Sequence, residues 1–386
     1  MAENKAAEFV GQLPVSLLPG EPEKPGMEGK PGRGKMLAYR HVGWPQLYAS
    51  LLLLMFFAQG LWLALHLPFD TGELAYLQPR ALVLTPAASP VTALIARAGS
   101  LAEPKGDPQW PVRLPFLFIG TALGASLWYV SRRLCGNSGG AVALALYTFS
   151  PTMLIYSARI CPEMVAAWSV FGCIFTSIAV AHTLYAPREV VLWNWKRILL
   201  LGTAMGLSAG SHFSTAIMAA LGLAFMLYLV PERNRAALAI MGAAVVVASI
   251  WFGLLEEFSP AAIQAVGSRD VAAGISRLEV VRHVVIQLLR DGPGFLLLLL
   301  SALGTVCVWR RPRFFGTLAP LLAAVLLLVC GVAFPAPGFS FTLLALPFLF
   351  VFTAGVWADI LQTRLAPIAM AIVLAALAIH AYWAHA

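Results

Sequence analysis

Long apolar runs recur along the whole chain, and they limit what it can fold into. Of its 386 residues, 60% are hydrophobic and 11% are charged, whereas a soluble domain carries about 25% charged residues. A run of about 20 apolar residues crosses the hydrocarbon core of a bilayer as one helix. The sequence therefore predicts an all-α, polytopic transmembrane helical bundle that lies in a lipid bilayer.

We expect about eleven membrane spans from the apolar runs. They cover residues 46–66, 113–131, 139–158, 163–185, 197–211, 213–230, 236–254, 293–309, 314–334, 339–359 and 365–384. Lys and Arg gather in every second connecting segment, from Arg40 to Arg364. Because positively charged loops stay in the cytoplasm, the N-terminus is expected inside and the C-terminus outside.

The spans divide the chain into four expected regions. Residues 1–45 form a cytoplasmic tail, and their high content of Pro, Gly and charge predicts disorder. Residues 46–254 form a transmembrane core with a long outer loop at 67–112. Residues 255–292 form a second long outer loop, and residues 293–386 form the C-terminal membrane helices. These first and fourth outer loops each carry an amphipathic stretch that is typical of a helix in the membrane interface.

Several function classes find no support in the sequence. The net charge of +8 comes from scattered loop residues rather than from a basic patch with aromatics, so no nucleic-acid partner is expected. Nucleotide-binding, zinc-hydrolase and serine-hydrolase motifs are absent, and no cofactor is predicted. The cysteines lack metal-ligand spacing, so no metal is predicted and they read as buried apolar residues: Cys135, Cys161, Cys173, Cys307 and Cys330.

Two acids follow the first span directly, at Asp70 and Glu73. Acids are costly to keep beside lipid, so a functional use is one explanation, with a carboxylate acting as a general base at the membrane surface. The alternative is structural. Asp70 would then cap an interfacial helix, and Glu73 would complete a capping box. Position alone favours the capping role.

Further candidates lie at the same outer side. Glu163 begins a span after Pro162, where the helix dipole already explains an acid. Arg159 is harder to explain, because the positive-inside rule disfavours an outer arginine. His212 stands at an outer turn, where a lone histidine is usually a solvated turn residue.

The outer cations form a second candidate group. Arg80, Arg113, Arg159 and His212 could together hold an anionic headgroup as the substrate-binding set. Alternatively, the loop arginines merely pair with Glu73, Glu103 and Asp107.

The order of several motifs resembles a known family. The segment PVRLPFLFIGTALGASLWYVSRRLCG is followed by LYTFSPTMLIYSARICPEMVAAW and then by GLSAGSHFSTAI. With the preceding acid pair, they resemble membrane-embedded C-type glycosyltransferases. The most similar branch is the one of protein O-mannosyltransferases and bacterial aminoarabinose transferases, glycosyltransferase family 39. The resemblance covers about residues 46–230, and the soluble outer domain of many relatives has no counterpart after the last span.

This resemblance implies transfer of a sugar from a polyprenyl-phosphate donor to an acceptor at the outer face of a bacterial inner or plasma membrane. The family acid after the first span falls on Asp70, with Glu73 beside it, and the second loop acid falls on Glu163. We therefore expect Asp70, Glu163 and His212 to converge at one outer-face cavity. The family often has a lysine where His212 stands, and its late Arg-Tyr pair is missing here.

Two other hypotheses stay open. The eroded phosphate contacts favour a catalytically inactive relative that acts as an accessory subunit, with other membrane subunits as partners. A transporter is less well supported, because the spans contain almost no ionisable residues that would mark an internal path.

Overall fold

The computed structural model describes residues 43–77, 89–100, 110–184, 195–258, 277–308, 317–333 and 339–385. This part is 91% helical and contains no strand. Residues 43–386 form one compact unit. The tail expected at residues 1–45 lies almost wholly outside the described residues, as do Arg80, Glu103 and Asp107.

The helices follow one another with short connections. The first half of the chain contains α2 (Trp44–His66), α3 (Thr71–Leu77), α4 (Pro90–Ser100), η3 (Trp110–Arg113), α5 (Leu114–Thr148), α6 (Pro151–Ser157), α7 (Pro162–Thr183), α9 (Trp195–Ser211), η4 (Phe213–Ala216) and α10 (Ile217–Leu229). The second half contains η5 (Pro231–Arg233), α11 (Asn234–Phe258), α13 (Arg277–Arg290), α14 (Gly292–Val308), α15 (Ala319–Ala333), α16 (Phe341–Ile360) and α17 (Ala366–His385).

Helix α5 is a hairpin of two arms, although its helical residues run on without a gap. Gly136 has a φ of 79° inside it, a conformation that glycine adopts without strain. The hydroxyl of Tyr147 donates a hydrogen bond of 2.5 Å to the carbonyl oxygen of Gly120, 27 residues away. In a straight helix these residues would be about 40 Å apart. The span expected at 113–131 therefore lies in the first arm of α5, whereas the one expected at 139–158 is divided between the second arm, which ends at Thr148, and α6.

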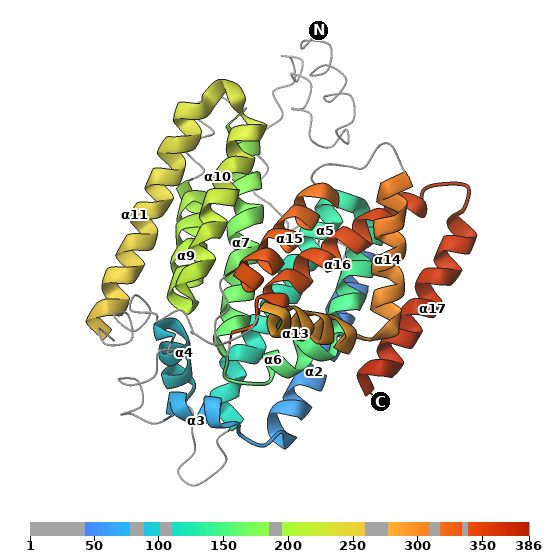
Figure 1. Cartoon of the computed structure of the whole chain (residues 1–386), viewed down its shortest axis with the longest axis horizontal. Coiled ribbons are helices and arrows are strands. Elements are labelled where there is room, and N and C mark those ends of the chain that lie inside the picture. The colour runs from blue at the N-terminus through green and yellow to red at the C-terminus, as the bar shows by residue number, and fades with distance from the viewer. Residues whose placement is uncertain are drawn as a thin grey trace, which may run out of the picture. The chain divides into compact units, whose positions relative to one another are not determined.

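Helix α16 lies at the centre of the larger hydrophobic cluster. Its whole length is apolar and buried, which is typical of a helix enclosed on all sides. It packs against α5, α7, α14 and α15. A second cluster joins α7, α9, α10 and α11. Figure 1 shows these four helices side by side, and α7 belongs to both clusters.

The predicted fold class is confirmed. Within the described ranges, six helices are long and apolar enough to cross a bilayer, or seven if α13 and α14 are taken as one bent span, and two shorter apolar helices accompany them. One of the six contains both arms of α5. Helices α2, α11 and α17 leave much of their apolar surface exposed, as expected for faces that contact lipid. The total of eleven spans stays a prediction, and so does the orientation of the termini.

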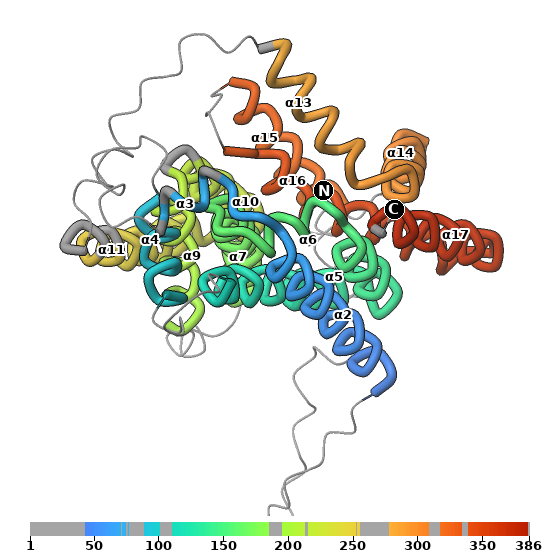
Figure 2. The backbone as a smooth tube through the Cα atoms, turned by 90° about the horizontal axis from the view of Figure 1, so that it is seen from below, coloured from blue at the N-terminus to red at the C-terminus, as the bar shows by residue number. Residues whose placement is uncertain are grey.

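Both amphipathic stretches form helices. Helix α4 covers the first stretch, and α13 covers the second. The chain bends by 106° between α13 and α14. Gly292 makes this bend with a φ of 88°, and the indole of Trp383 lies directly against it. Seen from below, α13 runs beside α15 and ends next to α14 (Figure 2).

Candidate functional site

A buried ion pair organises the chain after the first span. Arg113 donates from Nε to Oε1 of Glu73 at 3.0 Å and from Nη2 to Oε2 at 2.7 Å. Arg113 is completely buried, and Glu73 is 3% exposed. Such a two-point pair is rigid as well as strong, because the planar guanidinium fits the carboxylate. The loop arginines were expected either to hold an anionic headgroup or to pair with acids. Arg113 pairs with an acid.

The remaining donors of Arg113 hold the end of α2. Its Nη1 donates to the carbonyl oxygens of Ala64 and Leu67 at 2.9 and 2.8 Å, and Nη2 donates to that of Pro68 at 3.2 Å. The last carbonyl groups of a helix lack partners within the helix, and a cation there is favoured by the helix dipole. Because a guanidinium has five N–H donors, all of those of Arg113 are used.

The carboxylate of Glu73 is equally occupied. Besides Arg113, it accepts hydrogen bonds from the backbone N–H of Ile160 at 2.9 Å and from that of Asp70 at 3.1 Å. A carboxylate offers about four acceptor positions, so these contacts fill them. Glu73 and Arg113 together join the end of α2, the start of α3, the start of α5 and the segment before α7. We call this group the Glu73–Arg113 clamp.

Asp70 stands at the N-cap of α3, and the clamp fixes its backbone. The bond from its N–H to Glu73 is the backbone half of a capping box, as the structural explanation of the acid pair predicted. The side chain of Asp70 is 60% exposed. Its Oδ2 lies 3.9 Å from Nη1 of Arg159, which is 34% exposed. The Nε atom of Arg159 is buried and finds no hydrogen-bond partner among the described residues.

Glu163 is buried at the start of α7. Its carboxyl group interacts with the backbone N–H of Ser340 and the thiol of Cys161. Burial and the charge of Glu163 hold the pKa of Cys161 well above its usual range. Burial also raises the pKa of Tyr76 on α3, and the charge of Glu163 adds to the shift. Both groups therefore stay protonated beside this acid.

His212 is buried rather than solvated at its turn. Its ring stacks on Phe339 with 3.9 Å between the centroids and meets the edge of Phe341 at 5.7 Å. These two aromatic residues flank Ser340, which contacts Glu163. The hydroxyl group of Ser89 donates a hydrogen bond of 3.1 Å to the carbonyl oxygen of Gly210. This bond connects the start of α4 to the end of α9.

The convergence of Asp70, Glu163 and His212 stays a prediction, and two separate sets of contacts bear on it. Arg159 joins Asp70 to the segment before α7, and Ser340 joins Glu163 to the aromatic neighbours of His212. The cavity expected between them stays a prediction. Among the residues that the structure describes, no group of three or more His, Cys, Asp or Glu could hold a metal ion.

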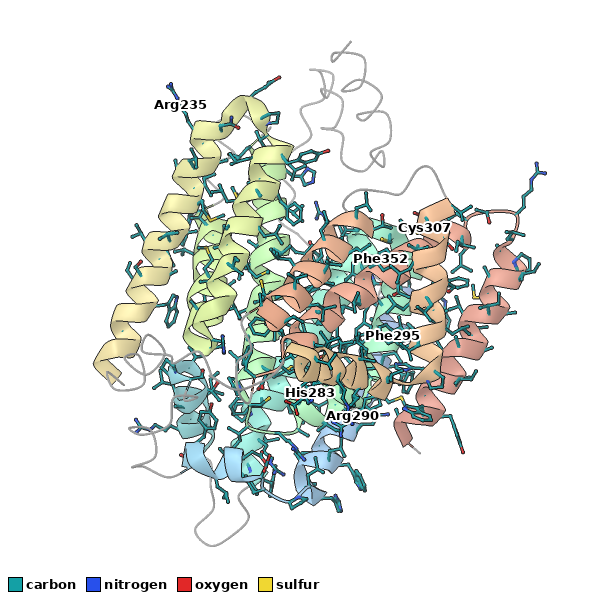
Figure 3. The ribbon with its side chains drawn as sticks, viewed as in Figure 1. Arg235, His283, Arg290, Phe295, Cys307 and Phe352 are labelled. Carbon is teal, nitrogen blue, oxygen red and sulfur yellow. The ribbon has the colours of Figure 1, made fainter. Side chains whose placement is uncertain are left out.

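The structure also contains a cavity that the sequence does not predict. It measures about 130 Å³ and is lined by Pro151, Thr152, Ile155, Tyr156, Gln287 and Arg290. Arg290 ends α13 and Tyr156 belongs to α6, so the two elements are far apart in the sequence. Figure 3 places Arg290 at the opposite end of the bundle from Arg235. The available signal was an arginine in a loop that is expected outside, where arginines are disfavoured.

A buried polar network holds the bend beside this cavity. Oδ1 of Asp291 accepts from Oγ of Ser150 at 2.5 Å and from the N–H of Thr152 at 3.4 Å. The two ring nitrogens of His380 lie 2.8 Å from the carbonyl oxygen of Asp291 and 2.9 Å from that of Leu146. A neutral imidazole can donate to only one of these carbonyl groups. The network ties α17 and the end of α5 to the bend.

Comparisons with known proteins rest on structure rather than on sequence. No protein-family model matches the chain, and no curated protein matches it. ArnT from Cupriavidus metallidurans in the apo state has a similar structure, with a TM-score of 0.60 and 16% identity over 86% of this chain and 62% of that one. ArnT bound to undecaprenyl phosphate gives a TM-score of 0.62 and 17% identity over 88% and 63%.

A third solved structure comes from an archaeon. The Archaeoglobus fulgidus oligosaccharyltransferase gives a TM-score of 0.56 and 12% identity over 87% of this chain and 52% of that one. The chain thus spans less than two thirds of each of these proteins. At such identities the likeness concerns the fold, and it agrees with the resemblance found in the motifs. The chain therefore has the polytopic membrane fold of the C-type glycosyltransferases ArnT and oligosaccharyltransferase.

Proposed function

We propose that this protein transfers a sugar from a polyprenyl-phosphate donor to an acceptor at the outer face of a bacterial inner membrane. The observation that carries the proposal is Asp70. It is an exposed carboxylate that a saturated buried clamp holds beside a half-exposed arginine. A fixed acid next to a cation suits a reaction that removes one proton and releases one phosphate.

In this proposal Asp70 is the catalytic residue. Its carboxylate takes the proton of the acceptor as the acceptor attacks the sugar. Arg159 binds the phosphate, whose negative charge grows as the sugar–phosphate bond breaks. The leaving polyprenyl phosphate keeps the electrons of that bond. The two side chains lie 3.9 Å apart, so the phosphate would have to displace this long ion-pair contact to bind Arg159.

The other predicted site residues receive supporting roles. Glu73 and Arg113, which have no hydrogen-bonding capacity left for a substrate, become positioning residues that fix Asp70. Glu163 holds the Ser340 segment that packs on His212. Arg80 stays a prediction as a further cation. The donor class is supported by the similar ArnT structure that was solved with undecaprenyl phosphate.

Sugar transfer by the Asp70→Asn variant tests the proposal. The purified protein is placed in liposomes with a polyprenyl-phosphate sugar and candidate acceptors, and transfer is measured. Loss of a general base lowers rates by roughly 10²- to 10⁴-fold. Thermal stability should hardly change, because the Asp70 side chain is mostly exposed.

Glu232→Gln, an exposed acid in η5, is the matched control and should leave transfer unchanged. An unchanged rate in Asp70→Asn removes Asp70 as the base. If the wild type transfers no sugar and copurifies with stoichiometric membrane partners, the accessory-subunit hypothesis replaces the enzyme.

A further inference from the structure

His380 is a completely buried histidine near the C-terminal end of α17, and both of its ring nitrogens face carbonyl oxygens. Nδ1 lies 2.8 Å from the carbonyl oxygen of Asp291, and Nε2 lies 2.9 Å from that of Leu146. A carbonyl oxygen can only accept a hydrogen bond, so each contact needs a proton on the nitrogen. A neutral ring carries one such proton, whereas the imidazolium carries two. Only the charged ring therefore satisfies both acceptors.

Both acceptors stand at the C-terminal end of a helix. Leu146 lies in the last turn of α5, and the N–H of Ser150, four residues further on, donates to Tyr147 at 3.2 Å. Asp291 directly follows α13. Carbonyl groups at such ends lack partners within the helix, and the helix dipole favours a positive charge beside them. The position of His380 thus favours the imidazolium at both nitrogens.

The carboxyl group of Asp291 supplies a counter-charge in the same network. It is completely buried. Burial raises the pKa of this carboxyl group to about 6, although hydrogen bonds from Ser150 and Thr152 oppose the shift. The group is therefore largely ionised at pH 7 and above. Its Oδ2 atom has no hydrogen-bond partner among the described residues. A positive ring in this network compensates a buried negative charge that would otherwise stand alone.

Other charges lie far from His380. Helix α17 packs against α14, α16 and α5. Helix α14 contains no charged residue, and neither does the second arm of α5 after Gly136. The charged residues within α5 and α16 lie at the ends remote from His380, and they are Arg132, Arg133 and Asp359. Arg290 precedes Asp291 and is exposed. Asp291 is therefore the buried titratable group that bears on the charge of His380.

We propose that His380 is a buried imidazolium that latches the ends of α5 and α13 to α17, and that this latch weakens as the pH rises above neutrality. We call the contacts of His380 with Asp291 and Leu146 the His380 latch. Burial disfavours a charge on the ring, whereas its two carbonyl partners favour one. The two contacts, the helix ends and the counter-charge together decide for the proton. The inference concerns the fold beside the cavity and does not depend on sugar transfer.

The His380 latch reaches the candidate site through α13. This helix ends directly before Asp291 and carries Gln287. Oε1 of Gln287 accepts a hydrogen bond of 2.6 Å from Oγ of Ser340, whose backbone N–H interacts with Glu163. Release of the latch would therefore loosen the helix that holds Ser340 beside Glu163. The latch thus connects the pH of the medium to the position of a predicted site residue.

The latch should stabilise the fold more at low pH than at high pH. It binds its proton more tightly than an unfolded chain does, and histidines of an unfolded chain release theirs near about pH 6.5. The stabilisation is therefore complete below about pH 6.5 and is lost as the pH rises, until the folded chain releases the proton too. Over this interval the folding equilibrium constant should fall by up to about tenfold per pH unit. The linked proton of Asp291 acts mainly at lower pH, because its pKa is raised only to about 6.

The experiment follows reversible unfolding of the full chain in mixed detergent micelles from about pH 6.5 to 8.5, the range above the ordinary histidine value. His380→Gln binds no proton, so the stability of the wild type relative to this variant should shrink as the pH rises. His283→Gln is the matched control, because it removes an exposed histidine of α13. This control should follow the wild type at every pH.

Nuclear magnetic resonance of the wild type measures the charge directly. Labelling isoleucine with ¹³C at the carbonyl carbon and histidine with ¹⁵N identifies His380, because Ile379–His380 is the one Ile–His pair in the sequence. Both ring nitrogens of His380 should be protonated at about pH 6.5, and the ring should keep this state to a higher pH than an ordinary histidine. If His380→Gln does not fold, this measurement decides the inference by itself.

The outcomes separate the latch from an ordinary buried histidine. A doubly protonated ring, with a stability difference that shrinks as the pH rises, supports the inference. A neutral ring at about pH 6.5, the ordinary midpoint for histidine, overturns it. A difference between the wild type and His380→Gln that stays constant or grows with pH also overturns it, because the side chain then contributes packing without a linked proton.

Discussion

Arg113 and Glu73 form a buried two-point ion pair, with N–O distances of 3.0 and 2.7 Å, and the backbone of Asp70 is bonded to the same carboxylate. The pair thereby fixes the backbone of Asp70, whose side chain lies at the surface. An exposed aspartate would otherwise sample many positions, whereas proton transfer needs a heavy-atom distance of about 2.6–3.2 Å. The clamp thus supplies order where the proposed chemistry needs it.

The clamp predicts a large loss of stability in Arg113→Met. This change removes the cation and leaves Glu73 buried without a counter-charge, which typically costs about 3–5 kcal/mol. It also frees the carbonyl groups at the end of α2. Reversible unfolding in mixed detergent micelles measures the free energy. Arg235→Met, the same change at an exposed position, should cost less than about 0.5 kcal/mol. Equal stability of the two variants would refute the clamp.

Arg159→Gln should weaken binding of the donor more than it slows the reaction. The guanidinium is half-exposed, makes only a 3.9 Å contact with Asp70 and keeps an unsatisfied Nε. Losing a charge-assisted contact to phosphate should raise the KM for the polyprenyl-phosphate donor by roughly 10- to 100-fold. Arg97→Gln, on an exposed position of α4, serves as control. An unchanged kcat together with an unchanged KM would remove Arg159 from the phosphate site.

Gly292→Ala should destabilise the bend before α14. A Cβ atom there would lie 2.5 Å from Cδ1 of Trp383, and the φ of 88° is strained for alanine. The conformation and the crowding each cost about 1–2 kcal/mol. The control is Gly304→Ala in the same helix, where nothing lies within 4 Å. That change should be neutral or stabilising by up to about 1 kcal/mol. Thermal unfolding measures the midpoint of each variant. Equal midpoint shifts for Gly292→Ala and Gly304→Ala would show that the bend does not require glycine.

Cysteine labelling tests the orientation in the membrane. In a protein without its native cysteines, a cysteine replacing Arg97 on α4 should react with an impermeant maleimide in intact spheroplasts. A cysteine replacing Arg235 in α11 should react only after the membrane is opened, because its loop is expected in the cytoplasm. The reversed pattern would invert the topology and place Asp70 inside.

The apolar runs predicted the fold class because a lipid environment leaves helices as almost the only solution. They did not reveal the bend at Gly292, since the amphipathic pattern of α13 fixes which face is apolar but not the angle to α14. The pairing of Arg113 with Glu73 was open in the sequence, because 40 residues separate the partners. Arg290 escaped notice for the same reason, as its neighbours on α6 come from the first half of the chain.

The bend at Gly292 also has an optical consequence. The indole Nε1 of Trp383 donates to the carbonyl oxygen of Arg290 at 3.1 Å, while its ring lies against Gly292. The backbone that carries the cavity arginine is thus in direct contact with a fluorophore on α17. Any ligand that shifts the end of α13 changes the electrostatic surroundings of this indole. The fluorescence of Trp383 on α17 should therefore respond to movement of α13.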